Sequence, residues 1–167
     1  MKRLILIRHA KSSWDNAALA DFDRPLNERG RRDAPLMAQR YAHAAELPLQ
    51  IVASPAVRAT STALIFAEAL NVSADTVRYE PEIYEATVET LLSVVRGLSD
   101  ELPNAVLFGH NPGFTDLIQL LVDDRLPFIE LPTRGIAVLA FDVAQWSDIV
   151  PGDAQLQAFR CPKEGLQ

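Results

Sequence analysis

Two arginines and two histidines of this chain stand where apolar runs end. Arg8 and His9 directly follow one apolar run, His110 comes just after another, and Arg58 stands shortly after a third. The planar fork of an arginine matches the oxygens of a phosphate group, and a histidine can act as a nucleophile that carries a covalent group. These residue types therefore predict chemistry on a phosphoryl group.

Such a cluster could transfer a phosphoryl group with side chains alone. A neutral imidazole beside a bound phosphoryl group could attack phosphorus in line, while the second histidine and the arginines stabilise charge on the equatorial oxygens. Phosphoryl transfer depends mainly on positioning and electrostatics, and the two arginines would take over the role that a metal has elsewhere. We therefore expect neither a metal nor another cofactor.

The elements that must position these residues alternate between short apolar runs and helical segments, a pattern typical of an α/β fold. Six runs are candidate strands, at residues 4–7, 50–53, 76–79, 105–108, 136–141 and 156–159. The last two have little sequence between them, so one of them should run antiparallel to the rest. Ligands of open α/β sheets bind at the carboxyl ends of parallel strands, where helix N-termini add free N–H groups. We therefore expect the two arginines and two histidines to meet above one edge of the sheet.

Capping residues predict where the helices begin, and the candidates are Asn27, Ser54, Thr87 and Asn111. Prolines directly after Ser54 and Asn111 suit the first position of a helix. Pro35 falls about two turns into the first helix, so we expect a kink or a break there rather than one straight helix.

Length and composition exclude several classes of protein. With 167 residues, 49% of them apolar, the chain is long enough for a real core, and we expect one domain over residues 1–167. Its 16 basic and 22 acidic residues give a net charge of −6, which disfavours non-specific binding to nucleic acid or to an anionic membrane. No apolar stretch approaches the length of a membrane helix, and the single cysteine, Cys161, permits no internal disulfide. These features favour the cytoplasm.

Four short segments form a set: LIRHA at residues 6–10, PLNERG at 25–30, SPAVRAT at 54–60 and GHNPG at 109–113. In this order, and over most of the chain, they resemble the histidine phosphatase superfamily, which has the phosphoglycerate mutase-like fold. The short form, with Lys11 and Ser12 after the first segment, is most similar to the SixA-type phosphohistidine phosphatases. The resemblance implies a three-layer α/β/α sandwich with a mostly parallel sheet and one antiparallel strand.

The resemblance also implies roles for four of the residues named above. His9 would be the nucleophile and would become phosphorylated. Arg8, Arg58 and His110 would complete the phosphate pocket, and water would hydrolyse the intermediate to release phosphate.

Other positions of the family pattern are less complete in this chain. The general acid of larger members is a glutamate after the third strand, for which Glu85 is the matching candidate and Glu82 an alternative. Lys11 replaces a glutamate of the mutase-like members. Asp15 replaces an asparagine that helps to hold phosphate, so we do not assign that role here. We expect Arg24 to form a salt bridge within its loop rather than to bind ligand.

The substrate class is inferred from the space left for a cap. Larger members carry a helical cap between the third and fourth strands, but only about one helix fits between Glu85 and Ala105. An open site without a large cap suits a phosphoryl group presented by another protein, so we expect phosphohistidine on a protein as substrate. A small phosphate ester stays the alternative, and a mutase would need a more closed site. A non-catalytic module that binds phosphorylated ligands is the remote alternative, and its expected mark is the loss of His9.

Overall fold

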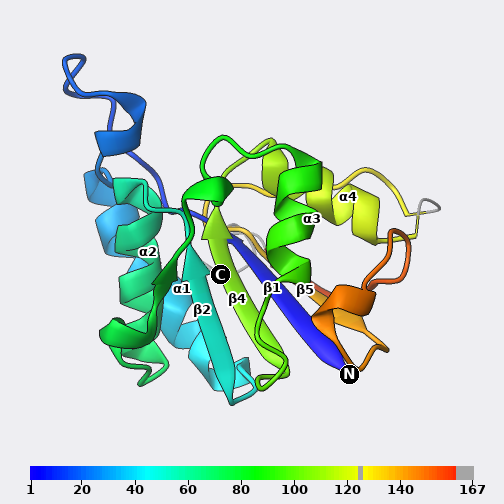
Figure 1. The fold of residues 1–167 in the computed structure, drawn as a ribbon. Coiled ribbons are helices and arrows are strands. Elements are labelled where there is room, and N and C mark those ends of the chain that lie inside the picture. Colours follow the sequence, from blue (N-terminus) through cyan, green and yellow to red (C-terminus); the bar gives the residue numbers. More distant parts are fainter. Residues whose placement is uncertain (124–125, 161–167) are drawn as a thin grey trace.

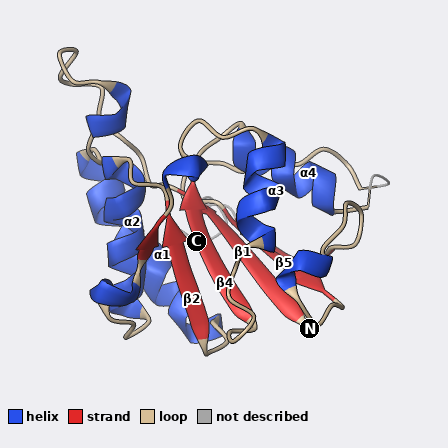
Figure 2. Cartoon of the chain, in the orientation of Figure 1, coloured by secondary structure: helices blue, strands red, loops and turns tan. Residues whose placement is uncertain are grey.

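The structure is a computed structural model that describes residues 1–123 and 126–160, and it centres on a six-stranded sheet (Figures 1 and 2). The strands are β1 (Lys2–Arg8), β2 (Leu49–Ala53), β3 (Arg78–Tyr79), β4 (Asn104–Gly109), β5 (Ile136–Phe141) and β6 (Gln155–Arg160). They lie in the order β3-β2-β4-β1-β5-β6. β5 runs antiparallel to both of its neighbours, whereas β1 to β4 pair in parallel. The expected sheet, mostly parallel with one antiparallel strand, is therefore confirmed.

In the described part of the chain, four α-helices cover this sheet in two layers. They are α1 (Glu28–Ala44), α2 (Val57–Ala69), α3 (Val88–Arg96) and α4 (Gly113–Leu121). α1 and α2 pack on the face that carries Ile5 and Ile7, and α3 and α4 pack on the face that carries Leu4 and Leu6 (Figure 1). Because successive side chains of a strand point to opposite faces, a strand covered on both faces needs a continuous apolar run. The three-layer α/β/α arrangement is confirmed.

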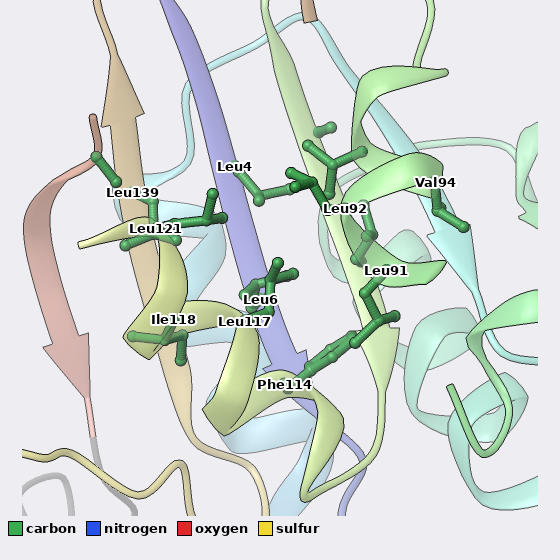
Figure 3. Packing of buried hydrophobic residues seen from close by; sticks show 14 of the residues in the cluster. Leu4, Leu6, Leu91, Leu92, Val94, Phe114, Leu117, Ile118, Leu121 and Leu139 are labelled. Atoms are coloured by element: carbon green, nitrogen blue, oxygen red, sulfur yellow. The ribbon is translucent and has the colours of Figure 1, made fainter. Parts of the chain in front are cut away.

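The face under α3 and α4 is filled by large apolar side chains, which fix how closely α4 approaches the sheet (Figure 3). Phe114, Leu117 and Leu121 of α4 are fully buried there. The ring of Phe114 lies against the last residue of β4, Gly109. A Cβ at Gly109 would lie 2.5 Å from this ring and 2.9 Å from Ile83, which is closer than real Cβ atoms approach. Glycine at this position therefore allows α4 to sit directly beside the end of β4.

α1 and α3 start at their predicted caps. The side chain of Asn27 accepts a hydrogen bond from the N–H of Gly30 at 2.7 Å, and that of Thr87 accepts from the N–H of Thr90 at 3.2 Å. Of the two outcomes expected at Pro35, a break is wrong, because α1 continues through this residue, and a kink stays a prediction. Pro35 has no N–H to donate to the carbonyl of the residue four positions earlier in the helix. That residue is exposed, so water can bind its carbonyl instead. The buried face of the helix meanwhile still packs on the sheet.

α2 and α4 begin later than predicted, so neither proline takes the first helical position. α2 begins only at Val57, and the hydroxyl of Ser54 accepts a hydrogen bond from the backbone N–H two residues on, at 3.3 Å. Asn111 precedes α4 by two residues, although its side chain still accepts from the N–H of Thr115 at 3.1 Å. The chain uses the extra residues to turn from strand to helix. Ser54 is consequently available for a contact other than capping α2.

β3 is shorter than the expected run at 76–79. Only Arg78 and Tyr79 pair with β2, and both are exposed, as suits the edge of the sheet. Thr76 belongs to a short 3-10 turn instead. Cys161 lies outside the described residues. Within the ranges described, no helix is both long and apolar enough to span a membrane.

Candidate active site

The carboxyl ends of β1 and β4 bring the two predicted histidines together. The strands are parallel neighbours with Arg8 opposite Gly109, and the backbone N–H of His9 donates to the carbonyl of Gly109 at 3.1 Å. The rings of His9 and His110 are 5.3 Å apart between centroids. Residues about a hundred positions apart in the sequence therefore meet at one edge of the sheet, as expected from the strand ends.

The ring of His9 is held in one tautomer. It is 7% exposed, and its Nδ1 lies 2.7 Å from the carbonyl oxygen of Ala10. A carbonyl oxygen can only accept, so Nδ1 carries the proton and Nε2 keeps its lone pair. Burial foremost, together with the nearby Arg58 and Arg8, lowers the pKa of His9 to about 4, against the opposing effect of the hydrogen bond to Ala10. His9 is therefore neutral at neutral pH and presents a free nitrogen.

His110 is held through its other nitrogen. Its Nε2 lies 2.8 Å from the hydroxyl of Ser54, whereas its Nδ1 is buried and has no hydrogen-bond partner within the described residues. Because the hydroxyl of Ser54 already accepts from a backbone N–H, it can donate its proton to Nε2. Nδ1 then carries the proton and can donate a hydrogen bond to a bound oxygen. Burial, followed by the neighbouring His9, lowers the pKa of His110 to about 3, so this ring is neutral as well.

Arg8 offers a second buried donor. Its Nη1 donates to the carbonyl of Leu131 at 3.2 Å, while its Nε is buried without a partner in the part of the chain that the structure describes. Burial lowers the pKa of this guanidinium from its usual value. Buried polar atoms are rarely left unpaired in folded proteins, so an orphaned N–H of this kind marks a place where a ligand could bind.

Arg58 is oriented by a residue that the sequence reasoning missed, Asp21. Nη1 of Arg58 donates to the backbone carbonyl of Asp21 at 2.7 Å, and Nη2 donates to its carboxylate at 2.9 Å. Arg24 donates to the other carboxylate oxygen at 2.9 Å, so the predicted salt bridge of Arg24 is confirmed. The hydroxyl of Tyr84 also donates to Asp21, at 2.7 Å. These hydrogen bonds, that from Tyr84 foremost, lower the pKa of Asp21 to about 2.

A cleft of about 430 Å³ opens beside these residues. Its walls include Asp21, Arg58, Tyr84, Glu85, Asn111, Pro112 and His110. Glu85 is exposed and adopts a left-handed backbone conformation, with φ 53°, which is uncommon for a residue other than glycine. Glu82 is also exposed but lies in a 3-10 turn and does not line the cleft. Of the two glutamates that the sequence left open, the geometry favours Glu85.

A buried ion pair supports the main chain at the end of β1. Asp33 of α1 and Arg134 are 7% and 8% exposed at their side chains and lie 2.8 Å apart. The backbone N–H of Arg134 lies 3.1 Å from the carbonyl oxygen of Arg8 and 3.2 Å from that of His9. Arg134 adopts a left-handed conformation, with φ 62°. The pair therefore ties α1 to the segment that carries the candidate nucleophile.

The two positions that depart from the family pattern lie at the surface. The side chains of Lys11 and Asp15 are both exposed, and the carboxylate of Asp15 has no polar partner within the described residues. Asp15 therefore does not pair with Arg58, whose carboxylate partner is Asp21. Within the described ranges, no three histidine, cysteine, aspartate or glutamate side chains come together as a metal site.

The comparisons with known proteins agree with this geometry. A model of the histidine phosphatase superfamily (branch 1) matches residues 4–99. A structure from Agrobacterium tumefaciens, provisionally named phosphohistidine phosphatase SixA, is 31% identical, with 96% of this chain and 98% of that chain covered and a TM-score of 0.78. The protein histidine phosphatase SixA in complex with tungstate has a TM-score of 0.80 at 21% identity, over 97% and 98% of the two chains, which shows a shared fold. Phosphoserine phosphatase 1 of Hydrogenobacter thermophilus is 41% identical over 73 residues, which cover 42% of this chain and 34% of that protein.

Proposed function

Because the chain belongs to the histidine phosphatase superfamily, we propose that it hydrolyses phosphorylated substrates through a covalent intermediate on His9, with phosphohistidine on another protein as the preferred substrate. The observation that carries the proposal is the state of the His9 ring, which is neutral and directs its proton to the Ala10 carbonyl. A neutral imidazole with a free lone pair is the form that can attack phosphorus.

In the first step, Nε2 of His9 forms a bond to phosphorus while the bond from phosphorus to the leaving group breaks. When the substrate is a phosphohistidine protonated on its second ring nitrogen, the electron pair of the breaking P–N bond returns to the substrate ring. That ring leaves as neutral histidine, so the step needs no external acid. His9 becomes a phosphorylated imidazolium, and the carbonyl of Ala10 stabilises its positive charge through the Nδ1 proton.

In the second step, water attacks phosphorus and the bond between phosphorus and Nε2 breaks. The electron pair returns to His9, which becomes neutral again. The attacking water loses one proton to solvent, and inorganic phosphate leaves. The two steps together consume one water molecule and restore the protein.

Arg8, Arg58 and His110 are proposed to stabilise the negative charge on the phosphoryl oxygens during both steps. The unpaired Nε of Arg8 and Nδ1 of His110 are available as donors, and the fork of Arg58 is fixed by Asp21. Fixed donors need no reorganisation when charge develops, which is why such sites accelerate phosphoryl transfer. Because the two arginines supply the positive charge, we expect activity to survive treatment with EDTA.

The shape of the cleft and the likeness to SixA support a protein substrate. Between β3 and β4 the chain forms only a 3-10 turn (Pro81–Ile83) and α3, and neither is a large helical cap. A histidine side chain on the surface of another protein could therefore reach His9. The name of the similar Agrobacterium structure points to the same substrate class.

A small phosphate ester is the second candidate substrate, and the position of Glu85 favours it. An alkoxide is a poor leaving group and needs a proton, which a carboxylic acid in the cleft could supply. The chain is locally similar to phosphoserine phosphatase 1, and the name of that protein refers to such an ester. If Glu85 acts as this acid, Glu85→Gln should lower kcat/KM about a hundredfold for an alkyl phosphate and less than threefold for phosphohistidine. An equal loss on both substrates, measured side by side, would remove Glu85 from this role.

The experiment that tests the proposal compares rates on two substrate classes in EDTA. Purified protein and the His9→Ala variant are given a phosphohistidine-bearing protein and a panel of small phosphate esters, and phosphate release is followed. The proposal expects the highest kcat/KM on the phosphohistidine protein and no turnover by His9→Ala. A higher kcat/KM on an ester would show that the protein is a general phosphatase that prefers small phosphate esters. Equal slow rates in both proteins would contradict the enzymatic proposal and favour a binding module.

A further inference from the structure

The cleft beside the proposed phosphate pocket carries two carboxylates in its lining. Of the residues that line the cleft, three carry a formal charge: Arg58, Asp21 and Glu85. Arg58 belongs to the proposed phosphate pocket, so beyond the phosphoryl group the lining carries two carboxylates. The neighbouring walls are formed by neutral side chains, including Tyr84 and Pro112.

Asp21 is positioned to act on a ligand in this cleft as well as on Arg58. Its side chain is 47% exposed, although its two oxygens accept hydrogen bonds from Arg58, Arg24 and Tyr84. These three donors fix the carboxylate in place, and they keep it ionised over the whole physiological pH range. Arg58 and Arg24 compensate part of this charge, but the exposed side of the carboxylate still lines the cleft, and Glu85 adds a second negative charge there.

We propose that Asp21 is a specificity-determining residue whose carboxylate favours substrates with a positive charge on the group attached to the phosphoryl group and disfavours substrates with a negative charge there. The inference rests on the proposed phosphatase activity at His9. A protonated phosphohistidine meets the requirement, because its ring is cationic and would be attracted by Asp21, which lines the cleft together with Tyr84. A carboxylate-bearing ester does not meet it, since its leaving group would face like charge.

The competing role for Asp21 is purely to hold Arg58, and the two roles predict different results. Loss of alignment of Arg58 would impair every substrate equally, because every substrate presents the same phosphoryl group. Loss of a selective charge would change the ratio between substrates that differ in the charge of the group attached to the phosphoryl group. The ratio of kcat/KM values between substrates therefore distinguishes an effect of Asp21 on substrate selectivity from its role in aligning Arg58.

The test uses three small substrates: free phosphohistidine with a protonated ring, phenyl phosphate and 4-carboxyphenyl phosphate. Before cleavage, the ring attached to the phosphoryl group is cationic in the first, uncharged in the second and anionic in the third. Asp21→Asn removes the charge and preserves the shape of the side chain. Asp23→Asn is the matched control, because Asp23 is an exposed residue of the same 3-10 turn that does not line the cleft. Inhibition by inorganic phosphate, measured for each variant, reports whether Arg58 still holds a phosphoryl group.

We expect Asp21→Asn to lower kcat/KM for phosphohistidine about tenfold and to raise it for 4-carboxyphenyl phosphate about threefold relative to phenyl phosphate, with Asp23→Asn within twofold of the wild type. An equal loss on all three substrates, together with weaker inhibition by phosphate, would overturn the inference and leave Asp21 as a support for Arg58. If the wild-type protein hydrolyses the two aryl esters but not phosphohistidine, the proposed substrate fails. The ratio between the two esters would still test Asp21 in that case.

Discussion

The ends of β1 and β4 lie side by side and each presents a histidine, but the two rings are held in opposite ways. Nδ1 of His9 is hydrogen-bonded to a backbone carbonyl, whereas Nε2 of His110 is hydrogen-bonded to a serine hydroxyl. A carbonyl that accepts a hydrogen bond from the ring stabilises positive charge on it, and a hydroxyl that donates a hydrogen bond to the ring does not. The hydrogen-bond partner, rather than the residue type, therefore distinguishes the proposed nucleophile from the proposed charge stabiliser.

Removal of His9 should have the largest effect. His9→Ala leaves no imidazole nitrogen after β1 to attack phosphorus, so turnover should fall at least about a thousandfold and no phosphorylated protein should form. Rapid quenching at alkaline pH, where phosphohistidine survives, followed by intact mass measurement would detect the intermediate. A phosphoryl group found on His110 in this variant would break the comparison, since it would make the two rings interchangeable.

Removal of His110 should have a smaller effect of a different kind. His110→Ala takes away one donor to the phosphoryl oxygens, which should lower kcat/KM about a hundredfold. The phosphorylated intermediate on His9 should still accumulate under single-turnover conditions. A folded His110→Ala protein that never becomes phosphorylated would assign part of the nucleophile's role to the end of β4.

The low pKa values of the two rings predict a loss of stability in acid. The folded pKa of His9 is about 4, below the value near 6.5 of an unfolded chain, so unfolding takes up a proton at intermediate pH. The contribution of His9 to the free energy of unfolding is complete above about pH 6.5 and is lost as the pH falls toward 4. The loss corresponds to about 3 kcal/mol. His110 acts in the same direction. Between pH 7 and pH 4, the free energy of unfolding measured with urea should therefore decrease less for His9→Gln than for the wild type. An equal decrease would contradict a neutral, buried ring at His9.

Removal of the hydroxyl that holds His110 should have the smallest effect. Ser54→Ala frees the ring of His110 to rotate, which should lower kcat about fivefold, in keeping with about 1 kcal/mol for a neutral hydrogen bond. The exposed Ser73, which caps a distant 3-10 turn, provides the matched control through Ser73→Ala. A kcat for Ser54→Ala equal to that of the control would show that packing alone orients His110.

The strand ends could be predicted from the sequence because their signal is local. Continuous apolar runs mark β1 and β4, and the residues that follow them must lie at the carboxyl edge of the sheet. His9 and His110 were found in this way, and Asn27 and Thr87 were recognised because a cap binds backbone only three residues away.

The supporting aspartates could not be predicted, because their contacts join distant segments. Asp21 stands in a loop, and only the folded chain brings it to Arg58 of α2. Asp33 stands in a helix otherwise rich in charge, and its partner Arg134 lies in a loop before β5. Ser54 has a sequence context that favours a helix cap, so its contact with His110 was missed for a local reason.

The tight contact at Gly109 also has a consequence for how this part of the protein can change in evolution. The ring of Phe114 and the side chain of Ile83 occupy the space that any side chain at position 109 would need. Substitution at the three positions is therefore coupled: replacement of the glycine requires Phe114 and Ile83 to shift or to be replaced by smaller residues. Among relatives, a residue other than glycine before the histidine should coincide with a smaller neighbour, and the order in which the two changes were acquired would record which intermediate sequences remained able to fold.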